Sequence, residues 1–552
     1  MIFGVVIAAT LLSTAEHPLQ PQISRFLEHR GTVQPTGLSR ADYLKVVDGQ
    51  VRALRKCLKP DGDLPDPVDG RTQFSPPCYA HSVATLAASG FDTDPQLLES
   101  GMRAMDFSVD SLAKGMSAFP DKHPDFYTYP VMLAFEQFEK VAPKERLETW
   151  RKQLSAINPA KTYAAYGKAD GNWTLVHAAG EYLRSLHRLT DPAYVAHALQ
   201  IQRPHMTPAG QYLEHGAPFA YDAFSRYFLT GMLQRGYQDT FYRDACWKGA
   251  WTSLLIQSPF GELPTGYRSA QHLWNEAELA AVYETYAAQY AQAGRPAEAG
   301  AFKRGARLAL ASIQKWIRPD GSGYIVKNRY PVEARHGYEG YSVHANYNLL
   351  ACSMLCAAWQ QADEAIVERP APAEVGGFVV RLPEFNMVVA NAGGNYLQYM
   401  TRGNGVYNPS GLIRVHLQGG CPQLGYSDGI LHKTTEPVRQ VEVLEESARQ
   451  VQFRAGGETL TLHAQGVTVT AGSVARIGFP MLVFDGQQET DIHLDGNALR
   501  LKRTDGGVQV TVNEPATATW QRTGKRLNHR IGMVEEAFTD AAVYRISVLK
   551  GP

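Results

Sequence analysis

The stretch "ERPAPAE", residues 368–374, separates two parts of the chain that differ in hydrophobic periodicity. Before it, "RGARLALASIQKWIRPDG" (304–321) repeats apolar residues every three or four positions and ends in Gly, as amphipathic helices do. After it, "VQVTVNE" (508–514) and "AVYRISVL" (542–549) alternate polar and apolar residues, which is typical of antiparallel strands. The proline-rich stretch therefore marks a boundary between a helical and a β-structured region.

The helical region has a repeating organisation, because aromatic and Gly-rich loops recur between its amphipathic segments. Helical hairpins arranged in a ring, with functional loops at one end, would produce this pattern. We predict a multidomain α+β protein: an (α/α) toroid or incomplete barrel over 39–366, a linker over 367–374 and an antiparallel β-sandwich over 375–552. The aromatic loops are 123–130, 169–174, 210–221, 264–277 and 335–347.

The first residues suggest export. The run "IFGVVIAATLL" (2–12) is apolar but too short to span a bilayer, and small residues follow it up to Ala15. We expect a signal peptide over 1–15, cleaved after Ala15, then an N-terminal extension over 16–38, and a periplasmic protein. No later segment has the length and hydrophobicity of a membrane span, so none is expected.

Composition and motifs narrow the function. Lys+Arg and Asp+Glu number 54 each, so no field of one sign points to nucleic acid, and an anionic ligand needs a local site. Walker, HExxH and post-strand GxGxxG motifs are absent, which disfavours phosphoryl transfer and dinucleotide chemistry. His336 and His344 stand eight residues apart, a poor metal motif. We expect no metal and no cofactor; the sequence leaves the oligomeric state open.

The loops concentrate Asn, His, Tyr and Arg. Asn172 and Trp173 fall at a helix start, where Asn is either a simple N-cap or an amide donor to an anion, and Trp is a sugar platform. His215 lies on a loop, and Tyr221 falls in the first turn if a helix restarts near Pro218. Aromatic packing between helices is the alternative interpretation of this last segment.

Further candidates lie in two later loops and one earlier loop. In "GYRSAQHLWNEAELA" (266–280), Arg268 and the polar residues after it fit one helical end, although Arg268 could also form a plain ion pair. The predicted substrate-binding residues are Trp173, Tyr127, His272, Trp274, Asn275, Glu276, His336, Tyr341 and His344.

The candidate residues follow a definite order along the chain: an Asn-Trp pair on a helix, then a His followed closely by Tyr, then an Arg in a later loop. This order resembles that of the polysaccharide lyases built on an (α/α) toroid with a C-terminal antiparallel β-sheet domain, such as chondroitin, hyaluronate, xanthan and alginate lyases and heparinase II. By this resemblance Asn172, His215, Tyr221 and Arg268 are the catalytic residues, and the substrate is an acidic oligo- or polysaccharide.

Such residues suit β-elimination from a 4-linked uronate, which loses its C5 proton and then its C4 oxygen. Removing that proton builds negative charge on the carboxylate, which Asn172 and Arg268 would stabilise. His215 or an ionised Tyr221 would take the proton, and Tyr221 could return one to the leaving oxygen. Because free Tyr has a pKa near ~10, a base role for Tyr221 needs nearby cations.

Two other classes remain open. A glycoside hydrolase on the same toroid would use two carboxylates, for which Glu214, Asp222, Glu276 and Glu339 are available. A non-catalytic glycan-binding protein would need only the aromatic loops. An unsaturated uronate product, which absorbs ultraviolet light, distinguishes the lyase from both.

Overall fold

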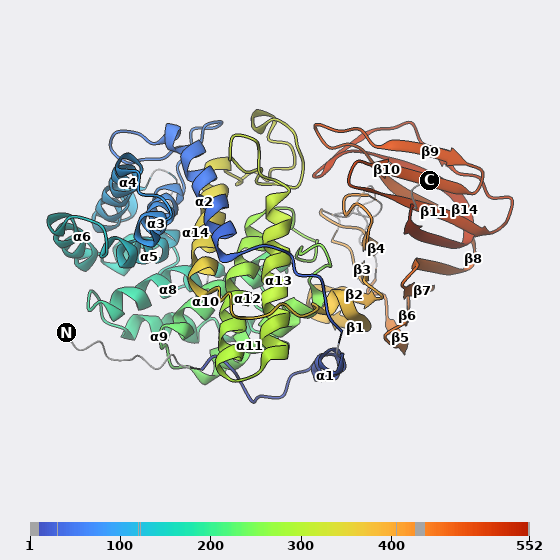
Figure 1. The fold of residues 1–552 in the computed structure, drawn as a ribbon, viewed down its shortest axis with the longest axis horizontal. Coiled ribbons are helices and arrows are strands. Elements are labelled where there is room, and N and C mark those ends of the chain that lie inside the picture. The colour runs from blue at the N-terminus through green and yellow to red at the C-terminus, as the bar shows by residue number, and fades with distance from the viewer. Residues whose placement is uncertain are drawn as a thin grey trace.

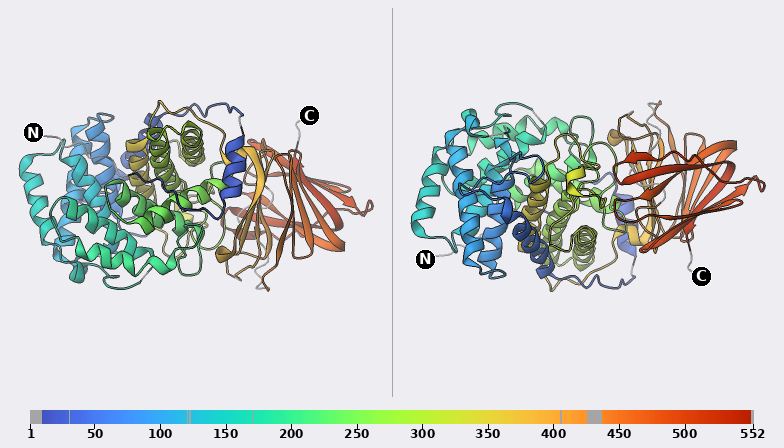
Figure 2. Two further views of the ribbon diagram at one scale, coloured as in Figure 1. Left: turned by 90° about the horizontal axis from the view of Figure 1, so that it is seen from below. Right: turned by 90° about the horizontal axis from the view of Figure 1, so that it is seen from above.

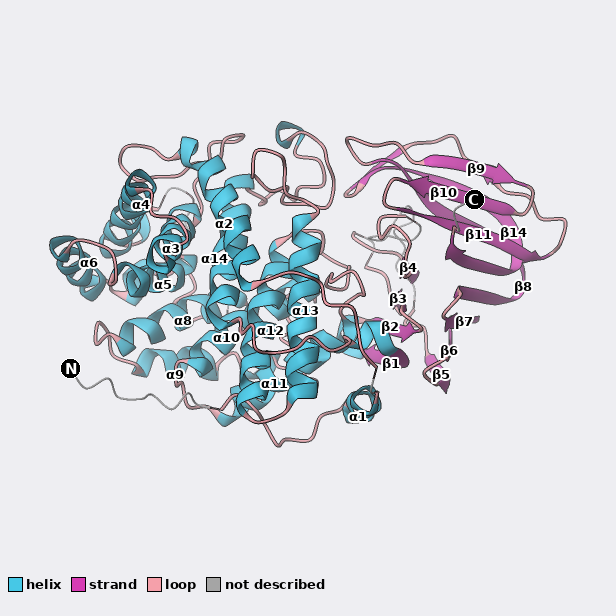
Figure 3. Ribbon diagram, viewed as in Figure 1, coloured by secondary structure: helices cyan, strands magenta, loops and turns pink. Residues whose placement is uncertain are grey.

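The computed structural model describes residues 10–29, 31–119, 121, 123–169, 171–404, 406–424 and 437–549. A helix-rich N-terminal part is followed by antiparallel sheets, and the two parts lie side by side along the long axis of the molecule (Figure 1, Figure 3). This arrangement confirms the fold class predicted from the change of periodicity.

The helical part has an inner and an outer layer. Inner helices contact one another in chain order, and the last also contacts the first: α3 (Ser75–Ser89), α5 (Thr128–Phe138), α8 (Asn172–Leu186), α10 (Phe219–Gln234), α12 (Trp274–Gln292) and α14 (His344–Gln361). These six are buried on nearly every side, as the apolar sequence of α14 indicated. The outer helices are α2 (Arg40–Leu54), α4 (Pro95–Lys114), α6 (Lys144–Ala156), α9 (Ala193–Gln200), α11 (Thr240–Ile256) and α13 (Pro296–Gln314).

The β-structured part is a sandwich of two antiparallel sheets. The first has the order β1-β2-β3-β4, with β1 (Gly376–Leu382), β2 (Met387–Ala392), β3 (Asn395–Met400) and β4 (Gly411–His416). The second has the order β5-β6-β7-β8-β14-β11-β10-β9, with β12 and β13 paired to β14. Its strands are β5 (Val441–Glu446), β6 (Gln450–Ala455), β7 (Glu458–His463), β8 (Gly466–Phe484), β9 (Asp491–Asp495), β10 (Ala498–Arg503), β11 (Gly506–Glu514), β12 (Gln521–Arg522), β13 (Leu527–His529) and β14 (Gly532–Val548).

The first sheet joins the two parts of the molecule. Every residue of β2 and β3 is buried, because one face of the sheet packs on the helices and the other on the second sheet. Phe378 and Val389 belong to the hydrophobic core of the helices, whereas Val379 and Val388 belong to the core of the sandwich. Between the last long helix and β1, the short helix α15 (Pro372–Val375) packs against β2 and α11, so the segment after 367 is folded onto both parts. Figure 2 shows the resulting contact from two further sides.

The N-terminal segment packs on both parts. Helix α1 (Gln20–Glu28) contacts β1, and Arg25 Nη1 donates to the carbonyl of Gly377 at 2.6 Å. Leu11 is buried, and its N–H donates to Gln289 Oε1 at 3.1 Å. Residues 1–9 of the expected signal peptide lie outside the described residues, so export stays a prediction. Within the described ranges, no helix combines the length and the hydrophobicity needed to cross a bilayer.

Candidate functional site

A pocket of about 270 Å³ opens where the inner helices begin. Each of the six inner helices contributes residues from its first two turns or from the loop just before them. The lining residues are Gln73, Phe74, His123, Phe126, Asn172, Trp173, Glu214, Tyr221, Phe224, Arg268, Trp274, Tyr341, Tyr347 and Leu350. All five aromatic loops identified in the sequence are represented, and the segment before α3 adds a sixth. Because backbone N–H groups at helix N-termini carry partial positive charge, six such ends favour an anionic ligand.

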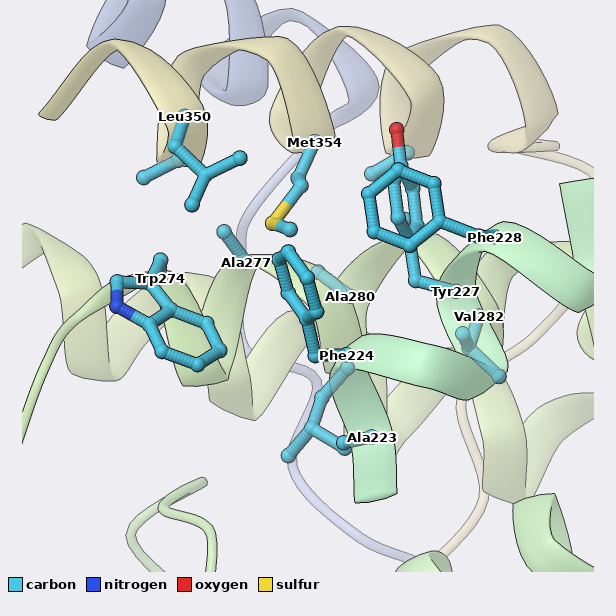
Figure 4. Packing of buried hydrophobic residues seen from close by; sticks show 14 of the residues in the cluster. Ala223, Phe224, Tyr227, Phe228, Trp274, Ala277, Ala280, Val282, Leu350 and Met354 are labelled. Atoms are coloured by element: carbon cyan, nitrogen blue, oxygen red, sulfur yellow. The ribbon is translucent and has the colours of Figure 1, made fainter. Parts of the chain in front are cut away.

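The floor of the pocket is aromatic and continuous with the core. Phe224 packs against Trp274 with ring centroids 5.2 Å apart and against Phe228 at 4.9 Å. Figure 4 shows these rings with Leu350 and the core residues behind them. Aromatic surfaces of this kind suit the apolar faces of sugar rings.

One wall of the pocket holds a carboxylate. Glu214 accepts hydrogen bonds from the backbone N–H of Asn172 (2.8 Å) and from its side-chain Nδ2 (3.2 Å), and lies 3.5 Å from Arg268 Nη2. The N-cap of α8 is Gly171, with φ of +60°, and a Cβ there would collide with the Glu214 carboxylate. Asn172 Oδ1 is buried without a hydrogen-bond partner. The wall therefore combines a helix N-terminus, an amide and a guanidinium around one carboxylate.

Tyr221 stands beside this wall. The Arg268 guanidinium lies over its ring, 4.8 Å from the centroid. Its hydroxyl is 3.3 Å from Ser269 Oγ, which is in turn 2.7 Å from the hydroxyl of Tyr341. Burial raises the pKa of Tyr221 above its ordinary value, although the bond to Ser269 and the Arg268 charge act in the opposite direction. Tyr221 is therefore a protonated phenol near neutral pH.

Arg268 is presented on a strained turn. Its neighbours Tyr267 and Ser269 both have positive φ, at +63° and +64°, although neither is Gly. The N–H of Tyr267 donates to Asn408 Oδ1 (2.9 Å), and the N–H of Ser269 donates to Glu339 Oε1 (2.6 Å), so both sides of the turn are held. Strain held in place in this way is common at functional sites.

The β-structured part also supports this turn. Arg530, in the turn between β13 and β14, donates from Nη1 to the carbonyl of Tyr267 and to Gln271 Oε1, both at 2.9 Å. Its guanidinium lies 4.6 Å from the ring centroid of Tyr407. The edge of the sandwich therefore lies against the rim of the pocket.

A histidine that the sequence analysis did not select lines the pocket. His123 Nδ1 lies 2.9 Å from the backbone carbonyl of Asp121 and 3.0 Å from its Oδ2, and its ring packs on Trp173 with centroids 4.9 Å apart. With Nδ1 engaged, Nε2 is the nitrogen free to exchange a proton. The composition of the loop 123–130 predicts a functional segment there, but the residue predicted from it is Tyr127 and not His123.

Several predicted residues lie away from the pocket lining. His215 is exposed, and its backbone carbonyl accepts a hydrogen bond from Arg268 Nη1 at 2.6 Å. Tyr127 is buried and donates to the carbonyl of Gln73 at 2.6 Å. His336 stacks on Tyr330 and bonds to the carbonyl of His529. His344 is buried at the start of α14, 3.1 Å from the hydroxyl of Tyr338.

The polar residues after Arg268 do not share a helical end with it. α12 begins only at Trp274, because the positive-φ turn and a bridge between His272 and Val326 precede it. His272 is buried against Ser342, and burial lowers its pKa to about 3. Asn275 donates to the carbonyl of Ser269. Glu276 forms a buried ion pair with Lys327 at 2.9 Å. Of this segment, Arg268 and Trp274 line the pocket, and the expectation that Arg268 and the polar residues after it share one helical end was wrong.

Among the described residues, no group of three or more His, Cys, Asp or Glu side chains is placed to hold a metal ion. No family model matches the sequence, and no curated protein sequence matches it.

Solved structures are similar over nearly the whole chain. One is chondroitin AC lyase of Streptomyces coelicolor A3 in complex with chondroitin sulphate, with a TM-score of 0.50 and 12% identity over 97% of this chain and 83% of that chain. Another is heparinase III, with a TM-score of 0.50 and 11% identity over 96% of this chain and 89% of that chain. The chain shares the fold of these polysaccharide lyases, as the resemblance in its sequence implied.

Proposed function

We propose that this protein is a polysaccharide lyase that cleaves a uronic-acid-containing glycan by β-elimination. One observation carries the proposal: Asn172 and Arg268 already bind a carboxylate, that of Glu214, beside the phenol of Tyr221. The same donors would bind the carboxylate of a uronate. Carboxylate recognition next to a proton donor is what elimination from a uronate requires.

We infer that the substrate carboxylate takes the place of Glu214 on these donors. The positive ends of the inner helices and Arg268 would then face the charge that grows on the uronate as its C5 proton leaves. The turn after Glu214 contains Gly216 and Ala217, both with positive φ, at +75° and +51°. A rearrangement of this turn would move the Glu214 carboxylate aside.

Proton transfer is assigned from the surroundings of each group. His123 Nε2 takes the C5 proton, since Nδ1 is held by Asp121. The electrons of the C5–H bond form the C4–C5 double bond, and the C4–O bond breaks with its electron pair on oxygen. Tyr221, whose raised pKa keeps it protonated, gives its proton to that oxygen. The product is an unsaturated uronate at the new non-reducing end.

A two-carboxylate hydrolase has less support. Among the described residues, Glu214 is the only carboxylate that lines the pocket, and it is bound by Asn172 and Arg268. Asp222 is buried in an ion pair with Arg226, and Glu276 in one with Lys327. Neither is free to face a water molecule.

We also propose export to the periplasm, where glycan polymers are accessible. Its basis is the apolar run at 2–12 followed by small residues up to Ala15. N-terminal sequencing of the mature protein tests this, and an intact first residue in the exported material would contradict cleavage after Ala15.

The test of the lyase is an ultraviolet absorbance screen against alginate, glucuronan, glycosaminoglycans and rhamnose-capped glucuronates. We expect absorbance to rise with at least one polymer as unsaturated uronate forms. A parallel reducing-sugar assay detects hydrolysis as well. New reducing ends without new absorbance would contradict the lyase, and no new ends with any polymer would favour a non-catalytic glycan-binding protein.

A further inference from the structure

A column of four aromatic rings, contributed by the segment before α8, by α8 and by α9 (Ala193–Gln200), runs from the buried interior to the surface. Tyr163 stacks on His177 (centroids 4.7 Å, planes 8° apart), His177 on Tyr194 (5.7 Å, 27°), and Tyr194 on Tyr166 (5.0 Å, 8°). Tyr163 and His177 are buried, Tyr194 is partly buried, and Tyr166 is 42% exposed. The outermost ring is therefore a flat aromatic surface open to solvent.

Hydrogen bonds fix the column from within. His177 Nδ1 lies 2.8 Å from Asp125 Oδ1, and its Nε2 lies 2.6 Å from the hydroxyl of Tyr194. The hydroxyl of Tyr163 donates to Glu181, which also pairs with Arg184. These bonds fix the three inner rings, and Tyr166 stacks on the outermost of them, so its ring loses less conformational entropy when it binds a ligand.

The carboxylate of Asp125 also connects the column to the pocket. Asp125 accepts hydrogen bonds from the N–H groups of Ala164 (2.9 Å) and Ala165 (3.0 Å), in the turn that carries Tyr166. Asp125 is adjacent to Phe126, which lines the pocket. Phe126 follows Asp125 in the chain, and Tyr166 follows Ala165, whose N–H binds the Asp125 carboxylate. Since consecutive Cα atoms are about 3.8 Å apart, this path places the Cα of Tyr166 within roughly 20 Å of that of Phe126.

Tyr166 differs from the other exposed aromatic side chains of the described residues, Phe91 and Phe241. Phe241 meets Tyr242 edge to face and lies beneath Arg203, on an outer helix. Tyr166 instead has a parallel ring behind it. Lys161 and Lys168, both exposed, flank it in sequence. An exposed flat ring, in a turn where Lys168 Nζ lies 2.9 Å from the carbonyl of Ala164, is complementary to a sugar of an acidic glycan.

We propose that Tyr166 is a sugar-binding platform, a subsite outside the pocket that stacks against a ring of an acidic glycan chain whose cleaved residue lies in the pocket. This inference rests on the proposed function for the identity of the ligand as a glycan. It does not depend on the chemistry of cleavage, because a platform binds the polymer whether or not the pocket cuts it.

The experiment is affinity electrophoresis in native gels containing alginate, glucuronan, hyaluronan or chondroitin sulfate. We compare the unmodified protein with Tyr166→Ala, the ring-preserving Tyr166→Phe and the control Phe241→Ala, after melting temperatures show that all are folded. At least one polymer should retard the unmodified protein, and Tyr166→Ala should weaken this binding about fivefold to tenfold, the scale of one aromatic contact. Tyr166→Phe should retain most of the retardation.

Equal retardation of Tyr166→Ala and the unmodified protein would overturn the platform, as would no retardation by any of the four polymers. Kinetics give a second readout: the Tyr166→Ala effect should appear in KM and shrink on the shortest oligosaccharide that is cleaved. An equal effect at every chain length would assign Tyr166 to the pocket's structure instead. Retardation that depends on Tyr166, in a protein that yields no unsaturated product, would refute the lyase and keep the platform.

Discussion

Arg268 and Glu276 lie eight residues apart in one segment, but Arg268 lines the pocket and Glu276 is buried in the core. Arg268 lies on a turn between two residues with positive φ and lines the pocket, where its guanidinium lies over the ring of Tyr221. Glu276 enters α12 and is fully buried with Lys327, which also pairs with Glu262. In the sequence, both are charged residues beside aromatic ones. The difference shows that a position near the start of an inner helix is not sufficient for a role in the chemistry. The side chain must also face the pocket, as that of Arg268 does and that of Glu276 does not.

The buried charges around Glu276 connect the two parts of the molecule. Lys327 and Glu262 lie next to Arg414 of β4, whose Nη1 donates to the carbonyl of Leu263 at 2.7 Å. This charge cluster joins the helices to the first sheet. Pocket substitutions should therefore change rate with little change of stability, and substitutions in the buried cluster should do the reverse.

The largest effect is expected from Tyr221→Phe. It removes one oxygen and keeps the ring between Arg268 and Trp274, so folding should be preserved. Loss of a general acid typically costs 10²–10⁴-fold in rate. We expect kcat to fall by this amount with KM nearly unchanged, measured by initial-rate absorbance. A fully active variant would remove Tyr221 from the mechanism.

Asn172→Ala should follow, with a loss of roughly 10²–10³-fold, the usual cost of removing one donor to a developing anion. Its backbone N–H would still bind Glu214. On substrates with esterified carboxylates the loss should be smaller, because less charge needs stabilising. The same loss on both substrate forms would show that Asn172 acts only as part of the α8 N-terminus.

The pair His123→Ala and His215→Ala separates the two histidines. His123 lines the pocket and His215 is exposed, so we expect about a 10²-fold loss for the first and little change for the second. Rates at several pH values with melting temperatures as folding controls provide the comparison. The reverse result would restore His215 as the base.

The pH profile sharpens the role of Tyr221. Its pKa is raised by burial above ~10, the value of a free Tyr, so the phenol keeps its proton through neutral pH. Activity that depends on this proton should be lost only as pH rises through the raised pKa. Ser269→Ala removes a hydrogen bond that lowers the pKa, and should shift the alkaline limb of kcat to higher pH. Activity that instead rises as pH increases through this pKa would indicate that Tyr221 acts as the base.

The smallest effect on rate is expected from Glu276→Gln. It leaves Lys327 with one partner fewer in a buried cluster, and breaking a buried ion pair costs up to about 3–5 kcal/mol. Thermal denaturation should show a lower melting temperature, while kcat of the folded protein should stay within about threefold of the original. A stable but inactive Glu276→Gln would favour the carboxylate-dependent hydrolase.

The sequence was sufficient for the fold class and for the segments that line the candidate pocket. Periodicity on either side of 368–374 located the helical and β-structured parts, and loop composition located the segments that meet at the pocket. It was not sufficient for choosing residues within a loop. Glu214 and His215 are adjacent and stand just before a turn with positive φ at Gly216 and Ala217, yet Glu214 lines the pocket and His215 is exposed.

Long-range contacts were equally hidden. Glu214 was considered only as a hydrolase carboxylate, since nothing in the sequence pairs it with Asn172, 42 positions earlier. Likewise, the support of the Arg268 turn by Arg530 joins residues that no local pattern connects. Such pairings depend on how the inner helices pack together in space. That packing cannot be predicted from short sequence patterns.

The most direct test of the central claim is cleavage in water enriched in the heavy oxygen isotope, followed by mass spectrometry of the products. Elimination breaks the C4–O bond without adding water, so we predict unsaturated products that carry no heavy oxygen from the cleavage step. Products that gain one heavy oxygen at each new reducing end, with no unsaturated uronate, would contradict the assignment of the Asn172–Tyr221–Arg268 pocket to a lyase.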